Sequence, residues 1–185
     1  WLLYRVDQPP LPPELRVDLG SPEPLAVMAL GEGWAGGEQI QGASANWAVA
    51  QGARVFLPAS EGASYRLTVT ALPFDYPGAA AQTVTPLVNG QRLEEQSLAP
   101  GWNTYTWDVP PRTVRQGLSE VRFEFARLDA PADVLPGSGT IGGTGVQAPV
   151  AIEVNSGGPA DFYIINIGEG DTGAVDGKDG SAHRP

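Results

Sequence analysis

The sequence predicts an all-β protein, a two-sheet antiparallel β-sandwich with almost no helix and most specifically a jelly roll. Gly (24) and Pro (18) together supply 42 of the 185 residues and interrupt almost every segment. Between them, short apolar runs alternate with polar residues as half-buried strands do, and helical periodicity is nearly absent. An Asn89-Gly90 pair separates two such runs, which is a strong signal for a tight hairpin.

An immunoglobulin-like sandwich is the alternative architecture, but the chain has no cysteine and so lacks the disulfide hallmark of that fold. The length fits one domain of ordinary size. We expect the sandwich to span residues 15–167. An extended Pro-rich lead covers residues 1–14, and residues 168–185 form a Gly/Asp-rich tail or the start of a following domain.

Apolar runs bounded by turn residues define the expected strands. In chain order these are Leu15–Leu19, Leu25–Leu30, Asn46–Ala50, Arg54–Pro58, Ser64–Leu72, Gln82–Val88, Arg92–Leu98, Trp102–Val109, Ser119–Arg127, Pro149–Val154 and Asp161–Ile167. The Gly-rich stretch Gly31–Glu38 and the Pro/Gly stretch Pro73–Ala81 are expected loops. A short helix could fit only around Val114–Leu118.

The alternation within a strand also predicts which side chains face the core, because successive side chains point to opposite faces. Three strands carry an apolar set on one parity, and Trp47, which alternates with Val49, is likewise expected to be buried. The inward sets are Tyr65, Leu67, Val69 and Ala71; Tyr105, Trp107 and Val109; and Val121, Phe123 and Phe125. On the first of these strands, Arg66, Thr68 and Thr70 should form a wet outer face.

The run from Tyr65 to Phe125 resembles the galactose-binding-like jelly rolls shared by many carbohydrate-binding modules. Its parts are Leu87-Val88-Asn89-Gly90, then Gly101-Trp102, then an aromatic strand ending at Pro110. This resemblance implies a sugar-binding accessory module in an extracytoplasmic setting, in the cell envelope or secreted, as part of a bacterial membrane-anchored parent protein. We expect no cofactor. Many modules of this family hold a structural calcium ion near the sheet edge, but the sequence does not select ligands for one here.

A second resemblance lies near the end of the chain. Phe162–Ile167, followed by Asp179–Pro185, resembles the opening of an interleukin-like EMT inducer domain, which implies a longer parent protein. The alternative is that these residues close the sandwich and continue as a tail. At the other end, Trp1–Arg5 could be the outer end of a membrane helix or a first edge strand.

The inventory of reactive groups argues against catalysis. The only His is His183 and there is no Cys, so a Ser-His triad, a thiolate nucleophile and a His/Cys metal site are not expected. The formal charge of −10 disfavours nucleic acid as a partner, and no apolar run is long enough to insert in a membrane. Gly137–Gly142 matches a dinucleotide fingerprint in letters, but the surrounding Pro and Gly residues leave no helix to follow it.

Aromatic residues outside the inward sets are the candidates for a ligand platform, because the apolar faces of sugars stack on aromatic rings. Trp34 and Tyr76 lie in expected loops, and Trp102 lies on the outward parity after a Pro-Gly turn. The polar side chains near them that could contact hydroxyl groups are Glu32, Glu38, Asp75 and Asn103. The alternative is that these loop aromatics pack over the ends of the hydrophobic core and bind no ligand.

These observations favour a non-catalytic module that binds a glycan or positions a glycan-active partner domain. The first alternative is a structural or protein-interaction spacer with no small ligand. The second is a glycosidase that uses two carboxylates, since that reaction needs no His.

Overall fold

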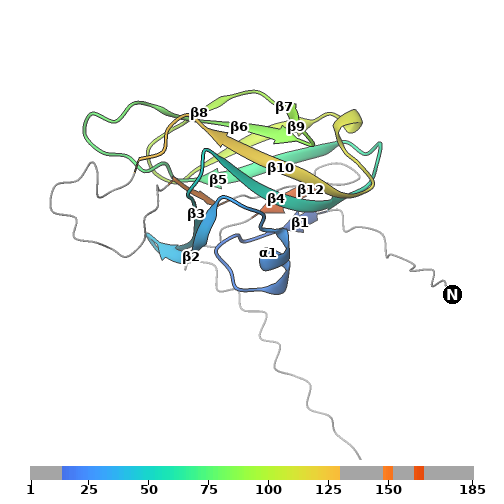
Figure 1. Ribbon diagram of the computed structural model, residues 1–185, viewed down its shortest axis with the longest axis horizontal. Helices are drawn as coiled ribbons and strands as arrows, with labels where there is room; N and C mark the ends of the chain where they lie inside the picture. Colours follow the sequence, from blue (N-terminus) through green and yellow to red (C-terminus); the bar gives the residue numbers. More distant parts are fainter. Residues whose placement is uncertain (1–13, 130–147, 152–160, 165–185) are drawn as a thin grey trace, which may run out of the picture.

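The computed structural model describes residues 14–129, 148–151 and 161–164, and within them two β-sheets pack face to face (Figure 1). The strands are β1 (Glu14–Arg16), β2 (Trp34–Ile40), β3 (Ala43–Ala48), β4 (Gly52–Ala59), β5 (Tyr65–Ala71), β6 (Gln82–Val88), β7 (Gln91–Arg92), β8 (Gln96–Leu98), β9 (Asn103–Val109), β10 (Gly117–Phe125), β11 (Ala148–Ala151) and β12 (Asp161–Ile164). The described helices are α1 (Pro24–Ala29) and the single 3₁₀ turn η1 (Pro111–Thr113). The predicted all-β sandwich is confirmed.

The larger sheet has seven strands, six of them in the order β1-β12-β5-β11-β3-β2. β12 and β11 pair with successive parts of one edge of β5, and β9 pairs with the opposite edge along Tyr65–Ala71. The smaller sheet has five, in the order β4-β10-β6-β7 with β8 paired to β6. The described pairings are antiparallel, as predicted, except that β12 runs parallel to both β1 and β5. The expected leading and trailing segments, the Gly137–Gly142 motif and His183 lie outside the described residues.

The predicted hairpin at Asn89-Gly90 is confirmed. Asn89 has φ 47° and Gly90 has φ 86°, the two positive values that a tight hairpin turn of this kind requires. β6 pairs antiparallel with β7 on either side of it. A second turn of the same kind, which the sequence analysis did not predict, joins β2 to β3 at Gln41-Gly42.

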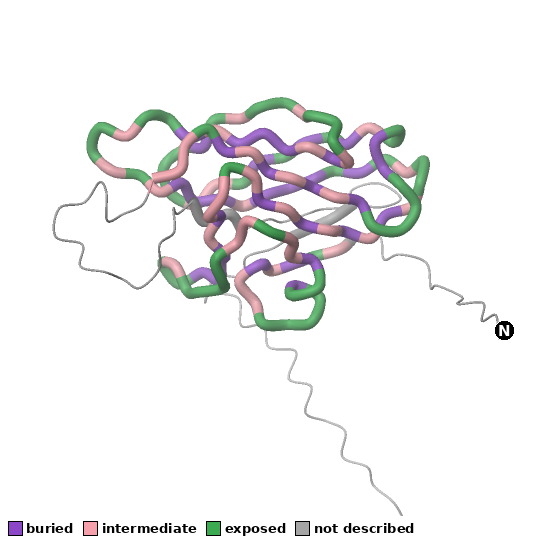
Figure 2. The backbone as a smooth tube through the Cα atoms, in the orientation of Figure 1, coloured by how far each residue is buried: buried purple, intermediate pink, exposed green. Residues whose placement is uncertain are grey.

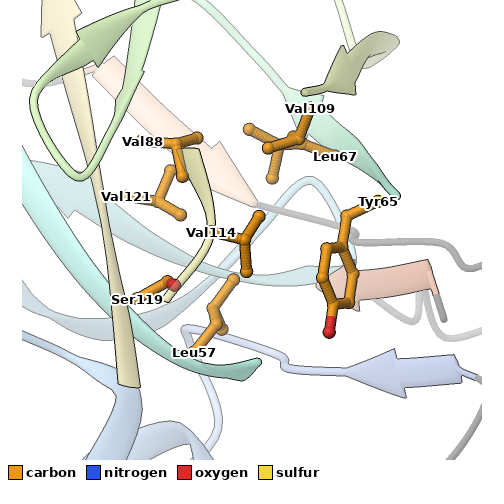
Figure 3. Close-up of a pocket in the computed structure, with 8 residues that line it drawn as sticks. All are labelled: Leu57, Tyr65, Leu67, Val88, Val109, Val114, Ser119 and Val121. Carbon is orange, nitrogen blue, oxygen red and sulfur yellow. The ribbon is translucent and has the colours of Figure 1, made fainter. Parts of the chain in front are cut away.

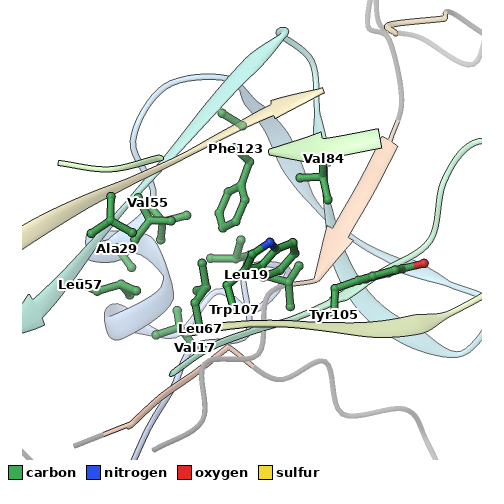
Figure 4. Close-up of a cluster of buried hydrophobic side chains, with 14 of the residues drawn as sticks. Val17, Leu19, Ala29, Val55, Leu57, Leu67, Val84, Tyr105, Trp107 and Phe123 are labelled. Atoms are coloured by element: carbon green, nitrogen blue, oxygen red, sulfur yellow. The ribbon is translucent and has the colours of Figure 1, made fainter. Parts of the chain in front are cut away.

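The three predicted inward sets are buried and supply much of the core between the sheets (Figures 2 and 4). Trp107 is 4% exposed, and its indole Nε1 donates a hydrogen bond of 2.7 Å to the carbonyl oxygen of Glu94. Tyr105 packs beside it with ring centroids 6.5 Å apart. These two aromatics therefore belong to the core. The outer face of β5 is less wet than expected, because Thr68 is only 6% exposed.

The predicted strand at Leu25–Leu30 is wrong, since residues 24–29 form helix α1. Pro24 begins the helix with a preset φ, and Ala26 and Ala29, three residues apart, are buried on one face. Leu30 then leaves the helix and forms a β-bridge with Val55 of β4. The helix thus lies against the edge of β4, a position that an alternating pattern in the sequence could not reveal.

The predicted loop at Gly31–Glu38 is also wrong over most of its length, because β2 begins at Trp34. The glycines allow its backbone to lie against the backbone of Gly20: a Cβ on Gly37 would lie 2.0 Å from the Gly20 carbonyl oxygen. Asn46 of β3 fixes the approach, since its Oδ1 accepts from Gly36 N at 2.9 Å and its Nδ2 donates to Leu19 O at 3.1 Å. Tertiary contact therefore overrides the local loop signal.

Smaller differences concern element ends. The expected strand Arg92–Leu98 is divided into β7 and β8, because Leu93–Glu95 leave the ladder. The expected short helix at Val114–Leu118 is absent from the described structure: η1 precedes that segment, and β10 already begins at Gly117. Trp47 is half-buried rather than buried.

Candidate functional site

The connections at one end of the sandwich gather into a single surface. They are the β5–β6 connection (72–81), the β8–β9 turn (99–102), the β3–β4 turn (49–51) and the segment after β10 (126–129), at the left of Figure 1. Hydrogen bonds fix two of these segments: Phe125 N, at the end of β10, donates to Gln51 O at 3.0 Å, and Ala126 N donates to Thr83 O of β6 at 3.2 Å. We call this surface the loop end.

Arg127 connects the segment after β10 to the β5–β6 connection and to β6. Its guanidinium Nη2 donates to the carbonyl oxygen of Phe74 at 2.7 Å, and Nη1 pairs with the carboxylate of Asp129. The backbone N of Arg127 donates to Gln82 Oε1 at 3.1 Å, and Gln82 Nε2 donates back to Arg127 O at 2.9 Å. Because the Arg127 side chain is only 14% exposed, it acts as a brace for the β5–β6 connection.

Tyr76 and Phe74 form an aromatic pair on this brace. Their ring centroids lie 5.6 Å apart at an interplanar angle of 41°, and the Arg127 Cζ lies 5.5 Å from the Tyr76 centroid. That distance suits a cation–π contact, which fixes the ring without burying it. A half-exposed ring held over a cation beside a carboxylate combines an apolar surface with hydrogen-bonding groups.

Trp102 and Asn103 enter the loop end from the other connection. Asn103 pairs with Ala71 in the β5–β9 ladder, so Trp102 and Leu72 leave the sheet side by side. Asn103 Nδ2 lies within hydrogen-bond distance of the carbonyl oxygens of Ala99, Pro100 and Gly101, at 3.0–3.2 Å. The amide therefore closes the turn that presents Trp102. The indole Nε1 of Trp102 is buried and has no hydrogen-bond partner among the described residues.

Trp34 and Glu38 both lie on β2: Trp34 pairs with Ala48, next to the 49–51 turn of the loop end, and Glu38 lies farther along the strand. Trp34 begins β2, its Nε1 donates to Arg54 O at 2.7 Å, and its ring packs against the core cluster. Between β9 and β2 stand β5, β11 and β3, so the two edge strands are separated by roughly 19 Å at the usual strand spacing. Glu38 is exposed on β2 opposite Ala45. The structure thus places Tyr76, Trp102 and Asn103 on connections at one end of the sandwich. Trp34 lies at the same end but across the larger sheet, and Glu38 lies farther along β2.

A small cavity lies at the opposite end of the core (Figure 3). Its volume is about 20 Å³, and six of its eight lining residues are aliphatic. The two lining hydroxyls are engaged: Tyr65 Oη with Ser60 N at 2.6 Å, and Ser119 Oγ with Asn89 Nδ2 at 3.1 Å. Since a cavity of this size holds about one water molecule, it is not a sugar site.

Residues 14–129, 148–151 and 161–164 are the ranges to which the next two observations apply. Within those ranges no group of three or more His, Cys, Asp or Glu side chains lies close enough to hold a metal ion. No helix in the same ranges is both long and apolar enough to cross a membrane.

Asp18 is a partly buried carboxyl group with a raised pKa. Burial raises its pKa above 3.8, although its Oδ1 accepts from Gly20 N and from Ser44 Oγ, both at 2.9 Å. These partners belong to the backbone contact between Gly20 and β2, so Asp18 is structural rather than part of the loop end.

Asp18→Asn is therefore expected to change how stability depends on pH. The folded state binds the Asp18 proton more tightly than the unfolded state, so this carboxyl favours folding below pH 3.8 and that contribution is lost as pH rises through the raised pKa. Asn keeps the acceptor oxygen. In urea unfolding, the free energy of unfolding of the variant should increase relative to that of the unsubstituted protein as pH rises from acidic to neutral. A difference that is constant with pH would contradict this account.

The chain is thus a two-sheet β-sandwich with an aromatic and charged cluster at one end. No protein-family profile matches it, and no curated protein matches it. Its structure is similar to "Family 35 carbohydrate binding module from Clostridium thermocellum", with a TM-score of 0.41 and 14% identity over 66% of this chain and 89% of that chain. It is also similar to a "family 35 carbohydrate binding module from an environmental isolate", with a TM-score of 0.35 and 15% identity over 65% of this chain and 85% of that chain.

Proposed function

We propose that this chain is a non-catalytic carbohydrate-binding module and that the loop end is its ligand surface. The observation that carries the proposal is the half-exposed Tyr76 ring, which is held by the guanidinium of Arg127, itself paired with Asp129. A sugar presents apolar C–H faces and a ring of hydroxyl groups, and it needs both kinds of partner at once. Trp102 supplies a second ring from the adjacent β8–β9 turn.

Within the described ranges, buried donors without a hydrogen-bond partner occur at the loop end and also at Trp47 Nε1, Arg54 Nε and Arg122 Nε, so they do not by themselves mark a ligand site. The indole Nε1 of Trp102 and the guanidinium Nε of Arg127 are both buried without a hydrogen-bond partner among the described residues. A donor left in this state loses the hydrogen bonds that water supplies, which costs about 1–3 kcal/mol.

The setting of the module is part of the proposal. The resemblance to galactose-binding-like modules supports an extracytoplasmic location and attachment to a parent protein whose other domain acts on a glycan. The proposal includes no cofactor, and a structural calcium ion is only an option that the same resemblance implies. The two-carboxylate glycosidase is disfavoured, because Asp129 pairs with Arg127 and Glu32 pairs with Arg54 at 3.2 Å.

The binding test is a glycan array followed by titration calorimetry with the oligosaccharides that it selects. Tyr76→Ala and Trp102→Ala should each weaken binding about tenfold or more, the loss of one stacking contact. Tyr76→Phe keeps the ring and is the matched control for stacking. Glu38→Gln, on the far edge strand, should bind like the native protein.

Two outcomes would contradict the proposal. If Tyr76→Ala and the unsubstituted protein bound the glycan with equal affinity, the loop end would not be the ligand surface. Failure of every glycan to bind would favour the spacer function instead. One observation supports that second candidate: Leu25, Val27 and Met28 on α1 are 43%, 58% and 80% exposed, an apolar group that a protein neighbour could cover.

A further inference from the structure

The Asn89-Gly90 turn clamps the β6–β7 hairpin to the rest of the sandwich through one side chain. Asn89 Nδ2 donates to the Thr113 carbonyl oxygen at 2.7 Å and to Ser119 Oγ at 3.1 Å. Its Oδ1 accepts from Glu120 N at 3.0 Å, and its own backbone N donates to Glu120 O at 2.8 Å. Every polar atom of the amide is therefore engaged with η1 or β10.

An Asn followed by Gly is also a chemically labile pair, since Asn is a thermolabile residue and Gly has no Cβ to hinder its amide nitrogen. The Gly90 nitrogen can attack Cγ of Asn89, forming an N–Cγ bond while the Cγ–Nδ2 bond breaks and ammonia leaves. Water then opens the resulting five-membered imide to aspartate or isoaspartate. The reaction needs no oxidant, reductant or cofactor.

The native contacts oppose this reaction. Hydrogen bonds on both Nδ2 and Oδ1 hold the Asn89 amide against η1 and β10, so Cγ cannot turn onto the Gly90 nitrogen until the clamp opens. After the reaction, a carboxylate stands where the amide donated, and it has no N–H to give to Thr113 O or Ser119 Oγ. The product would set negative oxygen against the Thr113 carbonyl.

We propose that Asn89-Gly90 is a spontaneous modification site gated by folding: it is protected while the hairpin is clamped, reacts when the hairpin opens, and leaves a hairpin that closes less well. The chain thereby records local opening of this end of the sandwich as a permanent chemical change. The end concerned is the one with the small cavity, whose lining includes Ser119, and not the loop end.

Peptide mapping tests the proposal directly. The intact chain is incubated at mildly alkaline pH either native or in urea, and is then cleaved with trypsin. Cleavage after Arg66 and Arg92 gives a peptide, Leu67–Arg92, in which Asn89 is the only Asn. Conversion at Asn89 should be at least about tenfold slower in the native chain, in proportion to how rarely the hairpin opens. Equal rates in the two states would overturn the proposal. Asn103, which precedes Thr104, is the internal control and should convert slowly in both.

Two variants separate the clamp from global stability. Ser119→Ala removes one acceptor of the amide and should accelerate conversion in the native chain. Val17→Ala lowers stability at a buried site outside the hairpin and its clamp. When the two variants are compared under conditions that give them the same free energy of unfolding, Val17→Ala should accelerate the conversion of Asn89 less than Ser119→Ala does. Equal acceleration by both variants would overturn the local gate. Asn89→Asp mimics one product and should unfold at lower urea concentration, with a smaller deficit at acidic pH, where the protonated acid regains a donor; unchanged stability would contradict the clamp.

Discussion

Trp107→Ala is expected to lower the free energy of unfolding by about 3–5 kcal/mol, the usual range for removing a large buried aromatic side chain. Trp107 is 4% exposed and packs on the inner face of β9 beside Tyr105. Its removal opens a cavity between the two sheets. It also leaves the Glu94 carbonyl oxygen without the indole donor that now lies 2.7 Å away. Urea unfolding followed by far-ultraviolet circular dichroism measures the change.

Two control variants separate the contribution of side-chain packing from that of the hydrogen bond to Glu94 O. Trp107→Phe keeps most of the ring volume but removes the hydrogen bond to Glu94 O, so a loss of about 1–2 kcal/mol is expected. Thr106→Ala changes the next residue, whose side chain is exposed on the outer face of β9, and should alter stability by only about 0.5 kcal/mol. If Trp107→Ala were no more damaging than Thr106→Ala, the core assignment of the inner face would be wrong.

The parity of β5, β9 and β10 was predictable because a strand alternates its side chains whatever its neighbours are. Tyr65, Trp107 and Phe123 each belong to a local pattern that a single segment displays. The Asn89-Gly90 turn was predictable for a similar reason, since its positive φ values are a property of two residues. The fold class follows from features that act over less than ten residues.

The segments that were mispredicted are those whose conformation is set by distant partners. Helix α1 has the large apolar residues Leu25, Val27 and Met28 outside and only Ala26 and Ala29 inside, where it lies against the edge of β4. β2 looks like a loop because it is rich in Gly, and one of these residues, Gly37, is needed for contact with Gly20, which lies 17 residues earlier. Neither requirement is visible in the segment itself.

The loop end divides in the same way. Tyr76 and Trp102 were recognised as candidates because loop position and strand parity are local features. Arg127 was not, although it fixes the site, because its partners Phe74 and Gln82 are 53 and 45 residues away. An Arg directly after an apolar strand is a weak signal alone. Only the sheet order, which places β10 beside β6, brings these residues to one end.

Gly37→Ala is expected to destabilise the chain by about 3 kcal/mol, at the upper end of the usual range for overpacking. The new Cβ would lie 2.0 Å from the Gly20 carbonyl oxygen and 2.9 Å from its Cα, so backbone rather than a flexible side chain would have to move. Gly20 has little room to move away from Gly37. Its N donates to Asp18 Oδ1, and a Cβ placed on Gly20 would lie only 2.3 Å from Ala45 N.

Gly42→Ala in the same hairpin is the matched control. Gly42 has φ +82° but nothing within 4 Å of its Cβ position, so this variant carries only the backbone strain of a positive φ, about 1 kcal/mol. The difference between the two variants in urea unfolding isolates the contact between Gly20 and β2. Equal losses would mean that β2 is held only by its ladder with β3. A larger loss for Gly37→Ala would show that the Gly-rich segment is a docked strand, and that Gly37 is required by the neighbouring backbone rather than by a turn.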